Sequence, residues 1–246
     1  MVFIYINRDK DQKRREIFLK NNSHLSNIKR FSAIDGNTIN REELISRGII
    51  TEDCIYINSA IGNALSHISL WNGVVESGKS ACIFEDDAVL CHNFEEQYEN
   101  ILKNIGSDWE IILFGYNTDA MLYLDVVPSI LEGIFTFDDV KFKKNIGQFS
   151  SQNITTQPIK LREAFGLCGY AISPKGAARL TNAIIPLRAM ELHIKIVNGL
   201  YKNGSLDNFL CAAYREMDAY CCVPPLCVSE NDKSLSTMWN AENFYY

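Results

Sequence analysis

The segment Ser80-Ala81-Cys82-Ile83-Phe84-Glu85-Asp86-Asp87-Ala88-Val89-Leu90 contains an apolar run that ends in three consecutive carboxylates. A short, almost uncharged apolar run of this kind, with a glycine just before it, is typical of a buried strand. Adjacent carboxylates repel one another, so at the end of a strand they are either solvated or hold a cation. Oxygen ligands suit Mg²⁺ or Mn²⁺. We therefore expect a divalent cation at this acidic triplet, and a solvated acidic loop is the alternative.

The chain has the bulk properties of one globular domain. It has 246 residues, of which 47% are hydrophobic and 22% charged, enough for a single core and typical of a soluble protein. We expect one domain over residues 1–246. No apolar run approaches the roughly 20 residues of a membrane helix, and the apolar run at 1–6 is too short for a signal peptide, so we expect a cytoplasmic protein. The net charge of -6 argues against nucleic acid as a partner.

The cysteine pattern predicts reduced thiols that pack in the core. Eight cysteines are present, most of them single in apolar surroundings, and none has Cys-x-x-Cys spacing. The nearest approach to a cluster is Cys221, Cys222 and Cys227, which has no histidine beside it. We do not expect a metal site there.

The N-terminal segments predict strand, helix and strand at 2–6, 11–21 and 28–34. This order is typical of an α/β fold with a parallel sheet, in which ligands bind at the carboxyl ends of the strands. Asn7, Arg8 and Asp35 follow the two strands and are candidates for one pocket. The alternative is that Asp35 only makes a turn with Gly36 and that Arg8 is a surface charge.

A helix is predicted at 61–76, ending at Gly78. Asn63 and His67 share one of its faces and could point at one ligand, although a single histidine often has only a structural partner. Further helices are predicted at 93–105, at 174–185 with Ser173 as its cap, and at 188–203, and strands at 109–114, 164–172 and 219–228, the last interrupted by two prolines.

The segment 117–160 lacks clear periodicity and carries several polar clusters. Such a stretch inside a domain is usually functional, so we expect an acceptor-side insertion or flap there. Further along, Asp207 begins an apolar or helical segment, where it is either a helix N-cap or a functional acid.

Several ordered motifs resemble glycosyltransferase family 25, which contains bacterial lipopolysaccharide and lipooligosaccharide galactosyltransferases and related collagen-modifying domains. The set is specific because the motifs keep their order over most of the chain. They are Ile4-Tyr5-Ile6-Asn7-Arg8 with Arg14-Arg15, Ala33-Ile34-Asp35-Gly36, Ile61-Gly62-Asn63-Ala64-Leu65-Ser66-His67, Ile83-Phe84-Glu85-Asp86-Asp87, Trp109-Glu110-Ile111-Ile112-Leu113, Gly169-Tyr170-Ala171-Ile172-Ser173, Asp207-Asn208-Phe209-Leu210 and Pro224-Pro225-Leu226.

The resemblance implies a GT-A type nucleotide-sugar-binding fold, in which a single, mixed, mostly parallel sheet is flanked by helices. It also implies a UDP-sugar donor, usually UDP-galactose, and transfer with inversion to a sugar hydroxyl. The implied acceptor is an oligosaccharide or glycolipid, such as a lipopolysaccharide or lipooligosaccharide, at the inner face of the bacterial inner membrane. The acidic triplet plays the part of an Asp-x-Asp motif that binds Mn²⁺ or Mg²⁺.

By the same resemblance, each candidate residue has an implied role. Glu85 and Asp87 are the metal ligands, and Asp86 is oriented toward sugar or backbone. Asp207 is the catalytic base that inversion requires, with Glu191 in reserve. Asn7, Arg8 and Asp35 surround the uridine, and Asn63 and His67 lie on the donor side of the site. A further metal or phosphate ligand in the polar run 229–236 stays unassigned.

Two other functions use the same features. A metal-dependent phosphohydrolase or nucleotidyltransferase also places acids at strand ends, but it releases phosphate or pyrophosphate instead of UDP. The other alternative is a nucleotide-sugar-binding protein that has lost turnover; the intact triplet argues against it, whereas an unfit Asp207 would favour it.

Overall fold

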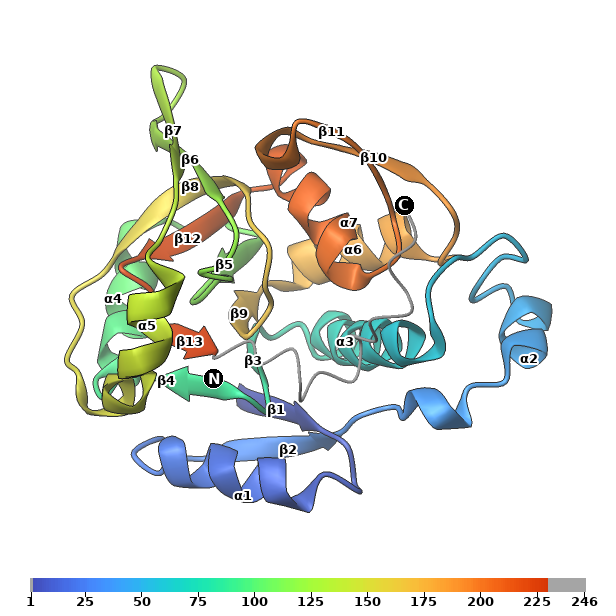
Figure 1. Cartoon of the computed structure of the whole chain (residues 1–246), viewed down its shortest axis with the longest axis horizontal. Coiled ribbons are helices and arrows are strands. Elements are labelled where there is room, and N and C mark those ends of the chain that lie inside the picture. Colours follow the sequence, from blue (N-terminus) through green and yellow to red (C-terminus); the bar gives the residue numbers. More distant parts are fainter. Residues whose placement is uncertain (1, 230–246) are drawn as a thin grey trace.

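A mixed sheet runs through the molecule (Figure 1). Within the described residues, 2–229 of the computed structural model, it has nine strands in the order β2-β1-β3-β9-β5-β12-β8-β6-β7. The pairs β2–β1, β1–β3 and β5–β12 are parallel and the others antiparallel, so β7, β8 and β9 run against the other six. The bounds are β1 Val2–Asn7, β2 Ile28–Ser32, β3 Ala81–Glu85, β5 Ile111–Leu113, β6 Leu122–Val127, β7 Leu131–Phe135, β8 Gln157–Glu163, β9 Gly169–Ile172 and β12 Ala219–Val223.

Helices and small elements complete the architecture. Two short antiparallel ladders join β4 to β13 and β10 to β11. The helices are α1 Gln12–Asn21, α2 Arg41–Ser46, α3 Asn58–Ser77, α4 Phe94–Asn104, α5 Asp139–Asn145, α6 Pro174–Ile184 and α7 Leu206–Ala213. The short strands are β4 Ala88–Leu90, β10 Glu191–Ile194, β11 Gly199–Lys202 and β13 Cys227–Ser229, and the 3₁₀ segments are η1 Gly36–Thr38, η2 Ile146–Ser151, η3 Lys195–Val197 and η4 Tyr214–Glu216.

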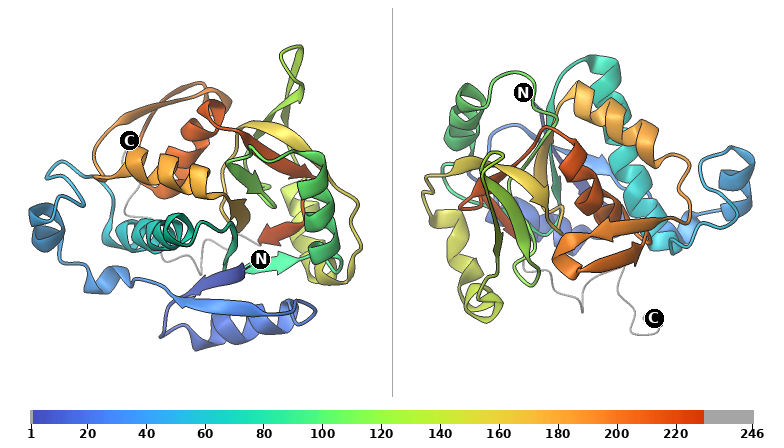
Figure 2. Two further views of the ribbon diagram at one scale, coloured as in Figure 1. Left: turned by 180° about the vertical axis from the view of Figure 1, so that it is seen from behind. Right: turned by 90° about the horizontal axis from the view of Figure 1, so that it is seen from above.

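Both faces of the sheet are covered, because side chains alternate along each strand. Ile83 of β3 packs with Trp71 of α3 and Leu180 of α6 on one face. The neighbouring Phe84 packs with Phe94 of α4 on the other face. Figure 2 shows α3 and α6 side by side on their face of the sheet. The α/β class with a mixed sheet is confirmed, and the larger number of strands runs in one direction as expected.

Helix α3 fixes the geometry around the acidic triplet. Gly78 ends this helix in the left-handed conformation, at φ 65°, as predicted. A Cβ atom at Gly62 would lie 2.6 Å from the carbonyl oxygen of Ile34, so only glycine permits this approach of α3 to the end of β2. The approach brings Asn63 to the carboxyl ends of β1, β2 and β3.

Most predicted elements are confirmed, including the Ser173 cap of α6, whose hydroxyl accepts from the backbone N–H of Gly176. The predicted helix at 188–203 is wrong, because this segment forms β10, η3 and β11. Ile194, at the end of β10, is β-branched and favours extended backbone, and Asn198 takes a left-handed turn at φ 53° between η3 and β11. Of the strand predicted at 164–172, only 169–172 is β-structure.

The segment 117–160 is more regular than its sequence predicts. It contains β6, β7, α5 and η2 and the beginning of β8, so it builds one edge of the large sheet. Alternation is hard to see in this region because several apolar side chains of the β6–β7 hairpin face solvent. All eight cysteines are buried and none forms a disulfide, as expected. Among the described helices, none has the length and apolar character required to cross a bilayer.

Candidate active site

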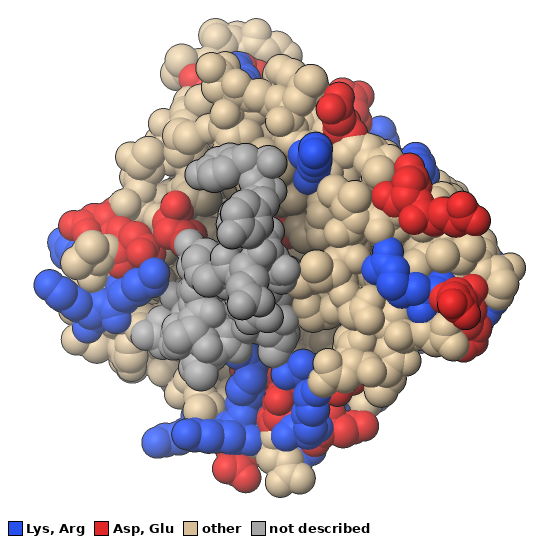
Figure 3. Space-filling view, turned by 45° about the vertical axis from the view of Figure 1, so that its right-hand side comes forward, with Lys and Arg blue, Asp and Glu red and all other residues tan. Residues whose placement is uncertain are grey.

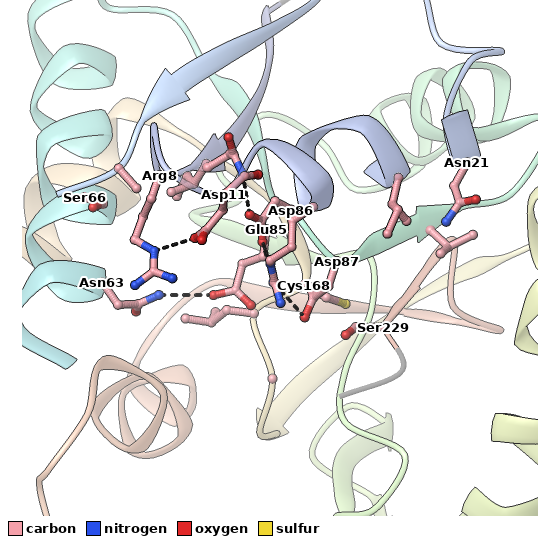
Figure 4. Close-up of a pocket in the computed structure, with 18 of the residues that line it drawn as sticks. Arg8, Asp11, Asn21, Asn63, Ser66, Glu85, Asp86, Asp87, Cys168 and Ser229 are labelled. Carbon is pink, nitrogen blue, oxygen red and sulfur yellow. Dashed lines mark hydrogen bonds and ion pairs between the residues drawn. The ribbon is translucent and has the colours of Figure 1, made fainter. Parts of the chain in front are cut away.

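A cavity of about 510 Å³ lies at the carboxyl ends of β1, β2 and β3 (Figure 4). Parallel strands end at the same edge of a sheet, which brings Arg8, Ile34 and the acidic triplet together. The strand β9 runs the opposite way, so the residues just before it, including Gly166, also reach this edge. The predicted residues that line the cavity are Asn7, Arg8, Asn63, Glu85, Asp86, Asp87 and Asp207.

Asp86 is held by two side chains, one from the end of β1 and one from α1. Its Oδ2 accepts from Asn7 Nδ2 at 2.7 Å, and its Oδ1 accepts from Arg14 Nε at 2.8 Å and from the terminal guanidinium nitrogen. Asp86 is only 9% exposed, so this pairing compensates a carboxylate that would otherwise be buried without a counter-charge. The Asp86 carboxylate therefore faces two side chains and not backbone, and its predicted contact with the sugar stays a prediction.

Glu85 is approached from α3. Asn63 Nδ2 donates to Glu85 Oε1 at 3.3 Å, and His67 Nε2 lies 3.7 Å from the same oxygen. Burial opposes ionisation, but these α3 side chains and the Arg14 charge together lower the pKa of Glu85, which therefore stays a carboxylate. His67 has no exposed surface, and its Nδ1 contacts the Tyr170 hydroxyl at 2.7 Å. It supports Glu85 from behind and does not line the cavity, which corrects its predicted place on the donor side.

Asp87 carries an unpaired oxygen. Its Oδ1 is buried and has no hydrogen-bond partner anywhere in 2–229. Its Oδ2 lies 3.6 Å from an Arg14 nitrogen, and Ser229 stands next to it (Figure 4). Burial and the Glu85 charge raise the pKa of Asp87 to about 6. An orphaned carboxylate oxygen beside a second carboxylate is the arrangement expected where a cation can bind.

Asp207 enters the cavity from α7. Ser205 caps this helix by accepting from the backbone N–H of Asn208, so the N-cap alternative for Asp207 is wrong. The backbone N–H of Gly166 donates to Asp207 Oδ1 at 2.7 Å. Burial raises the pKa of Asp207 to about 7, and the charges of Glu85 and Asp119 add to this effect. A carboxylate with a pKa near neutrality can accept a proton efficiently from a reacting group.

Comparison with known proteins shows the family of this chain. A family model described as glycosyltransferase family 25 (LPS biosynthesis protein) matches residues 1–195. The chain belongs to glycosyltransferase family 25. It is also 26% identical over 168 residues to "Procollagen lysyl hydroxylase and glycosyltransferase" of Acanthamoeba polyphaga mimivirus. That match covers 62% of this chain and 16% of the viral protein.

As a member of family 25, the chain is expected to bind a nucleotide-sugar donor. The next question is whether its side chains could hold a divalent cation beside the donor diphosphate. Within 2–229, no three histidine, cysteine or acidic side chains are grouped so that they could hold a metal ion by themselves. Magnesium-type sites commonly use one or two carboxylates and take their other ligands from substrate phosphates and water. Glu85 and the orphaned oxygen of Asp87 fit that kind of site, whereas Asp86 is already engaged.

Two predicted residues lie outside the cavity. Asp35 accepts from the backbone N–H of Asn37 and pairs with Lys10 at 2.5 Å, so the alternative of a turn-making aspartate is confirmed. Its link to the site is through Arg8, whose guanidinium lies 3.8 Å away. Glu191 is exposed on β10 and does not line the cavity, so it is not placed to act as the reserve base. Of the polar run 229–236, only Ser229 lies within the described residues.

The sequence interpretation assigned no role to Arg14, although the motif containing it was noted. Its position in the first turn of the charged helix α1 gave no indication that it reaches Asp86, 72 residues away. Lysine and arginine side chains gather on the lower part of the face in Figure 3, at the level of α1 and β2 in Figure 1. Arg8 and Arg14 therefore place positive charge beside a cavity in an acidic protein.

We expect Arg14→Met to destabilise the fold by about 2 kcal/mol, because among the described residues it leaves the buried Asp86 carboxylate with only the Asn7 amide as a hydrogen-bond donor. Urea unfolding followed by tryptophan fluorescence measures the change. The matched control is Lys13→Met, which removes the same charge from an exposed position of the same helix. Equal losses of stability in the two variants would show that Arg14 does not compensate Asp86.

Proposed function

We propose that this protein is an inverting, metal-dependent galactosyltransferase with a GT-A type fold. It transfers galactose from UDP-galactose to a hydroxyl of a lipopolysaccharide or lipooligosaccharide acceptor. The observation that carries the proposal is that one cavity holds two carboxylates at the end of β3, one with an orphaned oxygen, and a third carboxylate, from α7, whose pKa is near neutrality. Family membership supports the reaction class, and the choice of galactose and of acceptor follows the sequence resemblance.

The donor is placed along the wall formed by β1, β2 and β3. Arg8 lies beside Ile34 and Gly36 on this wall, and we place the uridine and its diphosphate there. Glu85 and Asp87 would hold Mn²⁺ or Mg²⁺, which would offset the negative charge that develops on the diphosphate. Arg14, fixed by Asp86, adds a positive charge next to the same position.

Transfer with inversion is a direct displacement at the anomeric carbon. The acceptor hydroxyl oxygen forms the new bond to this carbon, while the bond from the carbon to the phosphate oxygen breaks and UDP leaves with the electron pair. Asp207 takes the hydroxyl proton as the oxygen attacks. The Gly166 N–H bond keeps the Asp207 carboxylate in place, and burial makes the carboxylate basic enough for this role.

The proposal is tested by measuring UDP release from a panel of UDP-sugars with Mn²⁺ or Mg²⁺, using truncated bacterial oligosaccharides as acceptors. We expect UDP release that requires the metal and an acceptor and is largest with UDP-galactose. Release of phosphate or pyrophosphate would instead indicate a phosphohydrolase or a nucleotidyltransferase. UDP binding without turnover would indicate a silent nucleotide-sugar-binding protein.

The pKa of Asp207 also predicts the pH dependence of transfer. Burial raises this pKa to about 7, and only the ionised form can accept a proton. We expect kcat/KM to fall about tenfold per pH unit below pH 7 and to be level above it. Initial rates between pH 5.5 and 8.5 at saturating Mn²⁺ give the profile. A rate that is flat across this range would contradict the assignment of Asp207 as the base.

A further inference from the structure

A second cavity, of about 500 Å³, adjoins the proposed active site. Its walls come from the loop after β5, the segment after β7, the residue after β8 and the 3₁₀ segment η3. The Lys195 ammonium at the start of η3 lies 2.6 Å from the Tyr123 hydroxyl, which holds η3 to β6, the strand that follows the loop after β5. The β6–β7 hairpin and the β10–β11 ladder lie at the top of the molecule in Figure 1.

The two cavities meet at one pair of backbone segments. Asn117 and Gly166 line the first cavity, and their neighbours Thr118 and Phe165 line the second. The backbone N–H of Asn117 donates to the Phe165 carbonyl at 2.8 Å, so these segments lie side by side. Asp207 accepts from the backbone N–H of Gly166 at this boundary. The second cavity therefore lies next to the backbone segment that holds the proposed base.

Two aromatic rings in the second cavity are braced from behind. The ring of Phe137 packs on Tyr116 at 5.2 Å between centroids, and Tyr116 is buried. The ring of Phe165 lies 6.4 Å from that of Tyr201. Rings that are held in this way lose little conformational entropy when they bind a ligand. An aromatic face also suits the C–H face of a pyranose ring, as amphipathic contacts of this kind bury apolar area and leave hydroxyl groups at the rim.

The charged groups that line the second cavity are all negative. Hydroxyl and carboxylate groups come from Thr118, Asp119, Thr136 and Asp139, and no lysine or arginine is among the described residues that line this cavity. Asp139 already contacts the Thr118 hydroxyl at 2.7 Å and Lys143 at 2.9 Å. Asp119 is the exposed acid, so an anionic ligand would meet repulsion there.

We propose that this second cavity binds a neutral hexopyranose of the acceptor, the sugar whose hydroxyl is glycosylated. The assignment depends on the proposed function. In it, the apolar face of the sugar packs on Phe137 and Phe165, and its hydroxyls bond to the Asp119 and Thr136 side chains. A sugar that carries a carboxylate or phosphate is discriminated against by the Asp119 charge.

The test separates acceptor binding from donor chemistry. Phe137→Ala is compared with Phe135→Ala, which removes an equally exposed ring two residues earlier, outside the cavity. With UDP-galactose, Mn²⁺ and a neutral oligosaccharide acceptor, we expect the acceptor KM to rise at least tenfold in Phe137→Ala. The donor KM and the slow hydrolysis of UDP-galactose without acceptor should stay unchanged, and Phe135→Ala should resemble the wild type.

A charge variant tests the preference for a neutral sugar. Methyl β-glucoside and methyl β-glucuronide differ only in a carboxylate, and both are used as competitors of the neutral acceptor. Asp119→Lys should lower the inhibition constant of the glucuronide at least tenfold relative to that of the glucoside, with UDP affinity by calorimetry unchanged.

The outcomes distinguish two failures. If the wild-type protein releases no UDP from any UDP-sugar, the proposed function fails and the acceptor site with it. If the wild type transfers galactose but Phe137→Ala leaves the acceptor KM within twofold, or Phe135→Ala raises it equally, the acceptor site alone is overturned. An unchanged ratio of inhibition constants in Asp119→Lys would overturn the preference for a neutral sugar.

Discussion

Asp87→Asn is expected to lower galactosyl transfer by at least about a thousandfold. The variant removes the carboxylate whose orphaned oxygen is assigned to the cation, and a Lewis-acidic cation contributes several kcal/mol to such a reaction. Each 1.36 kcal/mol of barrier corresponds to a factor of about ten in rate. The loss should appear as weaker UDP binding in the presence of Mn²⁺, with little change in the metal-free affinity. Calorimetry with and without Mn²⁺, together with initial rates, measures both quantities.

The fold should tolerate this change. Burial and the Glu85 charge raise the pKa of Asp87 to about 6, so at pH 7 the ionised carboxylate is unfavourable in the folded state. An amide removes that charge, and we expect the melting temperature to stay the same or rise. Glu99→Gln makes the equivalent change at an exposed position of α4 and serves as the control. Normal metal-dependent transfer in Asp87→Asn would remove this residue from the metal site.

For Asp207→Asn we expect transfer to fall by about 10²–10⁴, the range typical of a general base. UDP-galactose affinity should be unchanged, because Asp207 comes from α7 and not from the wall assigned to the nucleotide. An amide oxygen can still accept from the Gly166 N–H, so the local backbone should be preserved. Single-turnover transfer and calorimetry with UDP separate the chemical step from donor binding.

The control for this variant is Glu191→Gln, which changes an exposed acid of β10 and should have no effect on rate. Stability supplies an independent readout. The folded pKa of Asp207, about 7, lies above the ordinary value of 3.8 for an aspartate, so its ionisation destabilises the folded state fully above pH 7 and not below about pH 4. Asp207→Asn should therefore raise the melting temperature at pH 8 and leave it unchanged at pH 4. Wild-type transfer by Asp207→Asn would exclude this carboxylate as the base.

The local sequence predicted the elements that hold the donor side of the site. Short apolar runs that end in polar residues mark β1 and β3, and Gly78 marks the end of α3. Because parallel strands end at one edge, Asn7, Arg8 and Asp35 were predicted to share one pocket, and Asn7 and Arg8 line the cavity. The shared face of Asn63 and His67 was also predicted, and both side chains reach Glu85.

Contacts between distant segments were not predictable from local patterns. The pairing of Arg14 with Asp86 and the burial of His67 behind Glu85 depend on how α1 and α3 pack against the sheet. The segment 188–203 has apolar residues at both helical and alternating spacing, and the strand pairing of β10 with β11 decides between them. Asp207 was noted as an acid at a helix start, but its contact with Gly166 needs the fold.

The most direct measurement is a crystal structure with UDP and Mn²⁺, with anomalous diffraction to locate the manganese. We expect one manganese bonded to Asp87 and Glu85 and to the diphosphate oxygens, with the uridine along the wall of Arg8, Ile34 and Gly36. A nucleotide bound elsewhere, or a diphosphate held by arginines with manganese far from these two carboxylates, would contradict the proposed donor site.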